Sequence, residues 1–197
     1  MKKKQILILF VLVLILHWCA SNKSNIPSHT NQNTDKAEIF EYNKNNSETI
    51  HYENKMENFS LDFPKNRTIK ESKFNVIIST PKNDNINENV IIVSQQLQKF
   101  LSIAEYYEET ILQLEKMLEW FKEIKSTDIV KWELKGKTII YEHTYQEDEN
   151  LRLKSLQTFF ITSENRVYSI NYTATKESFN THIKWVEKII DSFKMNK

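Results

Sequence analysis

Two residues of this chain have side chains and sequence neighbours suited to a specific role, Cys19 and His143. Cys19 is the only cysteine. It follows three lysines and an apolar run over residues 6–16, which is the layout of a bacterial secretory leader. A thiol at the end of such a leader can carry lipid, so we expect Cys19 to be acylated and to tie the chain to a membrane.

The leader allows other fates. The apolar run is 11 residues long, whereas a membrane-spanning helix needs about 20. Leu16 suits a lipoprotein cleavage site three residues before the cysteine, but His17 and Trp18 depart from the usual pattern. Simple secretion with cleavage after Ser21 and an uncleaved membrane anchor are the alternatives. We favour lipidation, with residues 1–19 as the signal peptide and its lipidated Cys19.

His143 lies beside Glu142 and close in sequence to the acidic turn of Glu147, Asp148 and Glu149. Imidazole and carboxylates together can bind Zn²⁺ or Mn²⁺. Adjacent residues of a strand point to opposite faces, however, so Glu142 and His143 cannot share one ion without a bulge. We therefore expect His143 to be either solvated or at the edge of the core, with no metal site and no cofactor. The acidic turn lacks the glycine and ligand spacing of a calcium loop.

No other residues form a catalytic motif. The sequence has no serine in a nucleophile elbow and no glycine-rich phosphate loop. His51 has no evident partner, and His182 is expected at the margin of the core. We therefore expect a non-enzymatic protein without catalytic residues.

The charge balance argues against a nucleic-acid partner. The chain has 27 basic and 26 acidic residues, and loss of Lys2, Lys3 and Lys4 with the leader leaves 24 basic residues. A nucleic-acid-binding protein normally needs a basic face.

Two segments follow the leader. Residues 20–49 are rich in Ser, Asn, Lys and Thr, which predicts a flexible polar tether. Residues 50–197 have the composition of one packed domain, and about 150 residues can bury a sizeable core.

Within this domain the apolar pattern predicts strands over 58–63, 74–80, 90–97, 128–134, 137–145, 151–162 and 166–174. Gly136 is the only glycine, and we expect it at positive φ in the turn after residue 134. Strands joined by short turns and interrupted by helices predict an α+β fold, with an antiparallel β-sheet flanked by helices in an α-β-α sandwich.

Two helices are expected. Ser102 and Glu105 form a capping box that starts the first helix. Its predicted buried stripe is Ile103, Tyr107, Ile111, Leu114, Leu118 and Phe121. The second helix begins near Thr175 or Ser178, and its predicted buried stripe is Phe179, Ile183, Val186, Ile190 and Phe193.

The aromatic residues admit two interpretations. They either line a groove for a peptide or glycan or fill the core between helix and sheet, and we favour the core. Trp120 and Tyr106 fall outside the predicted buried stripe and are expected to be exposed. The set comprises Trp120, Trp132, Trp185, Tyr106, Tyr107, Tyr141 and Tyr145.

The order and spacing of several segments resemble the PsbP-like domains. These segments are FSLDFP at 59–64, LSIAEYY at 101–107, LKSLQTF at 153–159, VYSINYTAT at 167–175 and IIDSFK at 189–194. PsbP-like domains occur in an extrinsic protein of photosystem II and in many bacterial secreted lipoproteins. The resemblance implies an antiparallel sheet between helices and a role in binding or assembly without a reaction.

Together these features lead us to expect a lipid-anchored, extracytoplasmic lipoprotein of the cell membrane that acts as a binding or assembly module. Its expected contacts are the membrane through Cys19 and a protein partner in the envelope. A carrier of a small ligand or metal is the alternative.

We predict that Cys19→Ser abolishes acylation, because the hydroxyl cannot replace the thiol that accepts the lipid. Metabolic labelling with a fatty-acid analogue, compared between the wild type and the variant, measures this directly. A labelled Cys19→Ser protein, or an unlabelled wild type, would contradict the assignment of the leader.

Overall fold

The computed structural model describes residues 48–72, 75–79, 89–145 and 148–196. The sequence predictions for Cys19, for the signal peptide over residues 1–19 and for most of the tether therefore lie outside the described residues and stay predictions. Glu147 of the acidic turn also lies outside the described residues.

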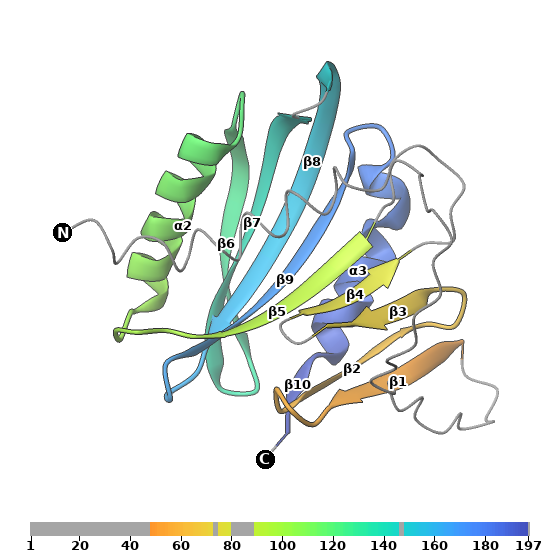
Figure 1. The fold of residues 1–197 in the computed structure, drawn as a ribbon, viewed down its shortest axis with the longest axis vertical. Helices are drawn as coiled ribbons and strands as arrows, with labels where there is room; N and C mark the ends of the chain where they lie inside the picture. The colour runs from red at the N-terminus through yellow and green to blue at the C-terminus, as the bar shows by residue number, and fades with distance from the viewer. Residues whose placement is uncertain (1–47, 73–74, 80–88, 146–147, 197) are drawn as a thin grey trace, which may run out of the picture. The chain divides into compact units, whose positions relative to one another are not determined.

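The described part of the chain forms two antiparallel sheets and two helices (Figure 1). The larger sheet has seven strands in the order β3-β4-β5-β9-β8-β7-β6. Its strands are β3 (Thr68–Glu71), β4 (Asn75–Ser79), β5 (Asn89–Gln96), β6 (Lys122–Lys131), β7 (Leu134–Tyr145), β8 (Asp148–Ile161) and β9 (Arg166–Thr175). The smaller sheet has the order β1-β2-β10, with β1 (Thr49–Asn54), β2 (Phe59–Pro64) and β10 (Lys194–Met195).

The helices lie on opposite faces of the seven-stranded sheet. Tyr106 of α2 (Ile103–Met117) makes an edge-to-face contact with Phe159 of β8, with ring centroids 4.8 Å apart. Phe179 of α3 (Phe179–Ser192) packs on Tyr172 of β9 at 5.2 Å. These contacts confirm the predicted α+β class and the helix–sheet–helix order. The separate small sheet is a difference from the single sheet that the sequence suggested.

The main core lies between β9 and α3 and extends to β2. In β9 the side chains of Tyr168, Ile170 and Tyr172 alternate on the face toward α3. Phe59 and Leu61 of β2 approach the same helix. Full burial of each such side chain contributes about 1.5–3 kcal/mol, so this packing fixes α3 to both sheets.

The start of α2 is the predicted capping box. The Ser102 Oγ accepts a hydrogen bond from the Glu105 amide at 3.2 Å, and Glu105 accepts one from the Ser102 amide at 2.8 Å. The Ser102 amide and the Ser102 hydroxyl both donate to the Glu105 carboxylate, and these two hydrogen bonds lower the pKa of that carboxyl.

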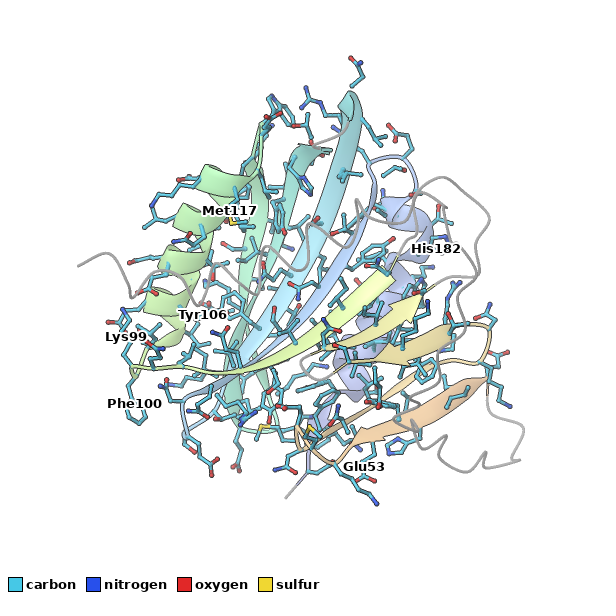
Figure 2. All side chains as sticks on the ribbon, viewed as in Figure 1. Glu53, Lys99, Phe100, Tyr106, Met117 and His182 are labelled. Carbon is cyan, nitrogen blue, oxygen red and sulfur yellow. The ribbon has the colours of Figure 1, made fainter. Side chains whose placement is uncertain are left out.

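The predicted buried stripe of α2 is confirmed at Leu114 and Leu118, which are buried, but was wrong at Ile103, Tyr107 and Ile111, which are only half-buried. The buried residues in the first half of the helix are Tyr106 and Thr110, and Tyr106 is only 6% exposed. The side chain of Tyr106 points from α2 toward the sheet (Figure 2). The ring of Phe159 lies under this face, and the Thr110 hydroxyl is satisfied by the Tyr106 carbonyl at 2.8 Å, so a threonine is buried there. Tyr107 instead donates to Glu123 of β6. The helix also ends at Met117, before Phe121.

The predicted role of Gly136 was also wrong. The β6–β7 turn is formed by Trp132 and Glu133, because Lys131 pairs with Leu134. Gly136 lies inside β7, opposite Phe160, and its φ is not positive. A Cβ at this position would lie 2.5 Å from the Phe159 carbonyl oxygen and 2.7 Å from a Phe160 ring carbon. The glycine is therefore needed for close approach of β8 and not for a turn.

Replacing Gly136 by alanine is expected to lower the free energy of unfolding by about 1–3 kcal/mol, because the added methyl group overlaps β8. Chemical denaturation measures the change. Lys135→Ala, at the exposed neighbouring position, is the control and should leave the stability nearly unchanged. Equal stability of the Gly136→Ala protein and the wild type would contradict this account.

Candidate functional site

Glu142 and His143 point to opposite faces of β7, as the strand alternation predicted. The Glu142 carboxylate accepts a hydrogen bond from the Lys176 ammonium at 3.0 Å. His143 lies on the other face and bonds Ser155 of β8. The two side chains therefore have separate partners and do not converge on one ion.

His143 is buried in a chain of hydrogen bonds that crosses three strands. Its Nδ1 lies 3.0 Å from the Thr144 carbonyl oxygen, which can only accept, so Nδ1 carries the proton. Its Nε2 then accepts from the Ser155 hydroxyl at 3.2 Å. Because Ser155 has given its only proton to His143, the Thr173 hydroxyl donates to Ser155 at 2.8 Å. This order requires a neutral imidazole.

Burial lowers the pKa of His143, and this agrees with the neutral form. The Thr144 carbonyl acts in the opposite direction, but its effect is smaller than that of desolvation. His143 is 3% exposed and Ser155 is 2% exposed.

A serine bonded to a histidine is also the arrangement of a nucleophile and its base. Here β8 pairs with β7 on one side and with β9 on the other, so its amides are engaged in the sheet and do not form an oxyanion hole. The buried Ser155–His143 pair therefore fixes strands to each other.

A second polar network lies on the same face of the sheet. The Gln157 amide nitrogen donates to Ser169 at 3.3 Å, and Ser169 donates to the Asn171 carbonyl oxygen at 3.1 Å. The Asn171 amide nitrogen completes the series by donating to the Ile91 carbonyl at 3.3 Å. The Gln157 Oε1 atom is buried without a hydrogen-bond partner. This network was not predicted from the sequence, although Ser169, Asn171 and Thr173 alternate along β9 and could have indicated it.

The other titratable candidates are ordinary surface groups. His51 is exposed and lies 2.7 Å from Asp62 on the neighbouring strand. His182 is half-buried on α3. Among the described residues, no group of three or more His, Cys, Asp or Glu side chains is arranged to hold a metal ion. Neither of the described helices is long and apolar enough to cross a membrane.

The exposed apolar residues cluster on one edge of the large sheet. Four of the seven large apolar residues exposed in the described chain lie in or beside β6. We call these four the β6 rim: Trp120 at 50% exposed, Ile124 at 45%, Val130 at 72% and Trp132 at 59%. β6 is the last strand of the sheet, so its outer edge has no partner strand among the described residues. Phe100 is exposed elsewhere, on the loop before α2 (Figure 2).

The aromatic set is divided between core and surface. Tyr106, Tyr141 and Trp185 are buried, as the core interpretation requires. Trp120 is exposed, as predicted, whereas the expected exposure of Tyr106 was wrong. Trp132 is exposed at the β6–β7 turn, and its indole nitrogen donates to the Phe193 carbonyl at 2.9 Å.

Both exposed tryptophans have unfavourable backbone conformations. Trp120 has φ of 52°, and Trp132 and Glu133 have φ of 51° and 67°. Hairpin turns with two positive φ angles normally use Asn and Gly. A bulky residue in this region costs about 1–3 kcal/mol. Arg152 lies 3.9 Å from the Trp120 ring centre and Lys194 lies 5.2 Å from that of Trp132, so each indole is held in place.

The fold is that of PsbP-like proteins, as the sequence resemblance implied. Cyanobacterial PsbP (CyanoP) from Synechocystis matches with a TM-score of 0.56 and 9% identity, over 80% of this chain and 98% of CyanoP. LpqN, described as involved in cell envelope biogenesis of Mycobacterium tuberculosis, matches with 0.57 and 13%, over 71% and 83%. PA94, a protein of unknown function from Pseudomonas aeruginosa, matches with 0.52 and 18%, over 73% and 94%.

The chain belongs to the DcrB family, whose model matches residues 60–192. This range covers most of the described domain, from β2 to the end of α3. None of the curated proteins matches the sequence. The family and structural matches indicate no enzyme family.

Acidification is expected to destabilise the protein through His143. In the unfolded chain a histidine has a pKa of about 6.5 and binds a proton below that value. Burial lowers the pKa of His143 in the folded state, so the folded protein binds this proton less readily than the unfolded chain. The contribution of His143 to stability is therefore fully present above pH about 6.5 and is lost as the pH falls below that value.

His143→Gln removes the titrating group, so the decrease in unfolding free energy between pH 7 and pH 5 should become smaller in this variant. Denaturant titrations across that range measure the slope. His182→Gln is the control, and its slope should match the wild type. An unchanged slope in His143→Gln would contradict the neutral buried histidine.

Proposed function

We propose that this chain is a lipid-anchored, extracytoplasmic module of the bacterial cell envelope that binds a partner protein and catalyses no reaction. The leader ending at Cys19 supports the location and the anchor. Membership of the DcrB family and the fold shared with LpqN, itself described as involved in cell envelope biogenesis, support the envelope.

The observation that carries the binding role is the β6 rim. A surface with two exposed tryptophans and two exposed branched residues along one unpaired strand is unfavourable in water unless a partner covers it. Aromatic residues with fixed rings are also the residues that contribute most to protein interfaces. The indoles of Trp120 and Trp132 are each held by a cation or a hydrogen bond, so little side-chain entropy is lost on binding.

The partners of the polar side chains in the described part of the chain support the proposal that the protein is not an enzyme. The buried Ser155–His143 pair is enclosed in the sheet, and Glu142 is neutralised by Lys176. Arg166 is paired with Glu57 at 2.5 Å and also donates to Ser94, so it holds the β1–β2 turn against β5 and β9. These polar groups have structural partners within the fold, whereas the side chains of the β6 rim remain at least 45% exposed.

A photo-crosslinking amino acid at position 130 is expected to capture one discrete partner in intact cells, because Val130 is the most exposed residue of the rim. The same amino acid at position 70 of β3, the opposite edge of the sheet, is the matched control and should give no adduct. Electrophoresis and mass spectrometry measure the adducts.

The adduct at position 130 should also decrease in a Cys19→Ser background, since the unacylated form is no longer held near its partner by lipid. No adduct from position 130, or equal adducts from positions 130 and 70, would contradict the proposed binding role.

A further inference from the structure

The outer edge of β6 has the geometry to accept another strand. Lys131 and Leu134 close a two-residue turn, so they form a hydrogen-bonded pair of the β6–β7 ladder. Alternation then directs the backbone groups of Ile129 and Thr127 toward β7. The N–H and C=O groups of Ser126, Asp128 and Val130 are directed outward, away from the sheet. A neighbouring extended segment can bond to these groups.

The two faces of this edge differ in charge. Lys122, Lys125 and Lys131 lie on the face that carries Glu142 and Ile140. Lys131 is paired with Asp191, but Lys122 and Lys125 form no ion pair with the acidic side chains that the structure describes, a set that leaves out the side chains of residues 145–149. On the other face, Asp128 is neutralised by Lys137 at 2.6 Å, and Val130 is exposed. A segment beside β6 therefore meets unpaired positive charge on one face and apolar or neutral groups on the other.

The rim residues mark the two ends of the same edge. Trp120 and Ile124 lie at its beginning, and Val130 and Trp132 lie at its end. Sheet edges that are only protected from aggregation carry charges and bulges without exposed apolar residues. β6 has lysines and a bulge between Glu123 and Lys125, but Ile124 and Val130 within it and Trp120 and Trp132 beside it are exposed apolar residues. The opposite edge strand, β3, has none of the large exposed apolar residues of the described chain.

We propose that β6 binds an extended acidic segment of the partner protein by strand addition. The segment extends the seven-stranded sheet through the outward groups of Ser126, Asp128 and Val130. Its carboxylates lie beside Lys122 and Lys125, and its alternate apolar side chains lie beside Val130. The indoles of Trp120 and Trp132 contact its two ends. This inference rests on the proposed binding role and adds the mode of binding and the chemistry of the partner.

The test uses three synthetic ten-residue peptides and the full processed protein in detergent. The first peptide alternates Val with Glu, the second alternates Val with Lys, and the third has the acidic sequence with proline at alternate positions, which removes backbone donors. Affinity is measured by tryptophan fluorescence, and amide hydrogen exchange locates the contact. The acidic peptide should bind at least ten-fold more tightly than the other two and slow exchange at residues 126, 128 and 130.

Charge reversal provides the matched variants. Lys125→Glu should abolish the preference for the acidic peptide, because the new carboxylate offsets the charge of Lys122, and Lys122→Glu combined with Lys125→Glu should reverse it. Lys70→Glu, on the opposite edge strand, should leave both affinities unchanged. Equal binding of all three peptides, equal effects of Lys125→Glu and Lys70→Glu, or slowed exchange outside β6 would overturn the proposal. Exchange at these residues that slows with protein concentration alone would also overturn it, since a second copy would then occupy the edge.

The two proposals fail in different ways. A crosslinked partner at position 130 without preference for the acidic peptide overturns strand addition and leaves the binding role standing. Selective binding of the acidic peptide without a crosslinked partner in cells supports the edge chemistry and contradicts the cellular role.

Discussion

The packing of α3 against β9 and β2 is the contact on which the rest of this structure depends. It joins the two sheets, because the alternating side chains of Tyr168, Ile170 and Tyr172 meet the same helix that covers Phe59 and Leu61. Phe193, directly after the helix, contacts Phe59, Phe160 and Tyr168 at ring distances of 5.5–5.7 Å. The small sheet, the large sheet and the C-terminal strand therefore have one common core, and the Trp132 indole is bonded to its end.

One face of β8 and β9 packs against α3, and the opposite face of these strands is buried as well but carries polar side chains. That face carries Ser155, Gln157, Ser169 and Asn171, all buried, and a buried polar group costs free energy unless it is hydrogen-bonded. Apart from the Gln157 Oε1 atom, these side chains are hydrogen-bonded in two short networks, and His143 joins one of them only as a neutral base. The sensitivity to acid that we expect thus follows from the burial of His143 in the same sheet that the aromatic core stabilises.

Much of the fold could be predicted from the sequence because local signals were strong. The capping box at Ser102, the alternation of Phe59, Leu61 and Phe63, and the order of strands and helices each have a short-range cause. The burial of Tyr106 and Thr110 in α2 could not be predicted, because Thr110 is polar and because Phe159, which packs on Tyr106, is distant in sequence. Gly136 was misassigned for a similar reason. The sequence shows that a glycine can adopt positive φ, but it does not show that β8 packs closely against this position. The β6 rim could be predicted only in part from the sequence, because the exposure of Trp132 depends on which strand lies at the edge of the sheet.

The edges of the large sheet show how a fold without a visible catalytic site can still carry a specific surface. A seven-stranded open sheet must have two edges, and the short β3 and the long β6 solve this requirement differently. β3 has four residues and little apolar surface, which suffices to discourage pairing. β6 has ten residues, and the turns at both its ends place tryptophans at positive φ where small residues would cost less. The positive φ angles of these tryptophans and the exposure of their rings to water both cost free energy. A bound partner would remove the cost of exposure, so we expect binding at the β6 edge.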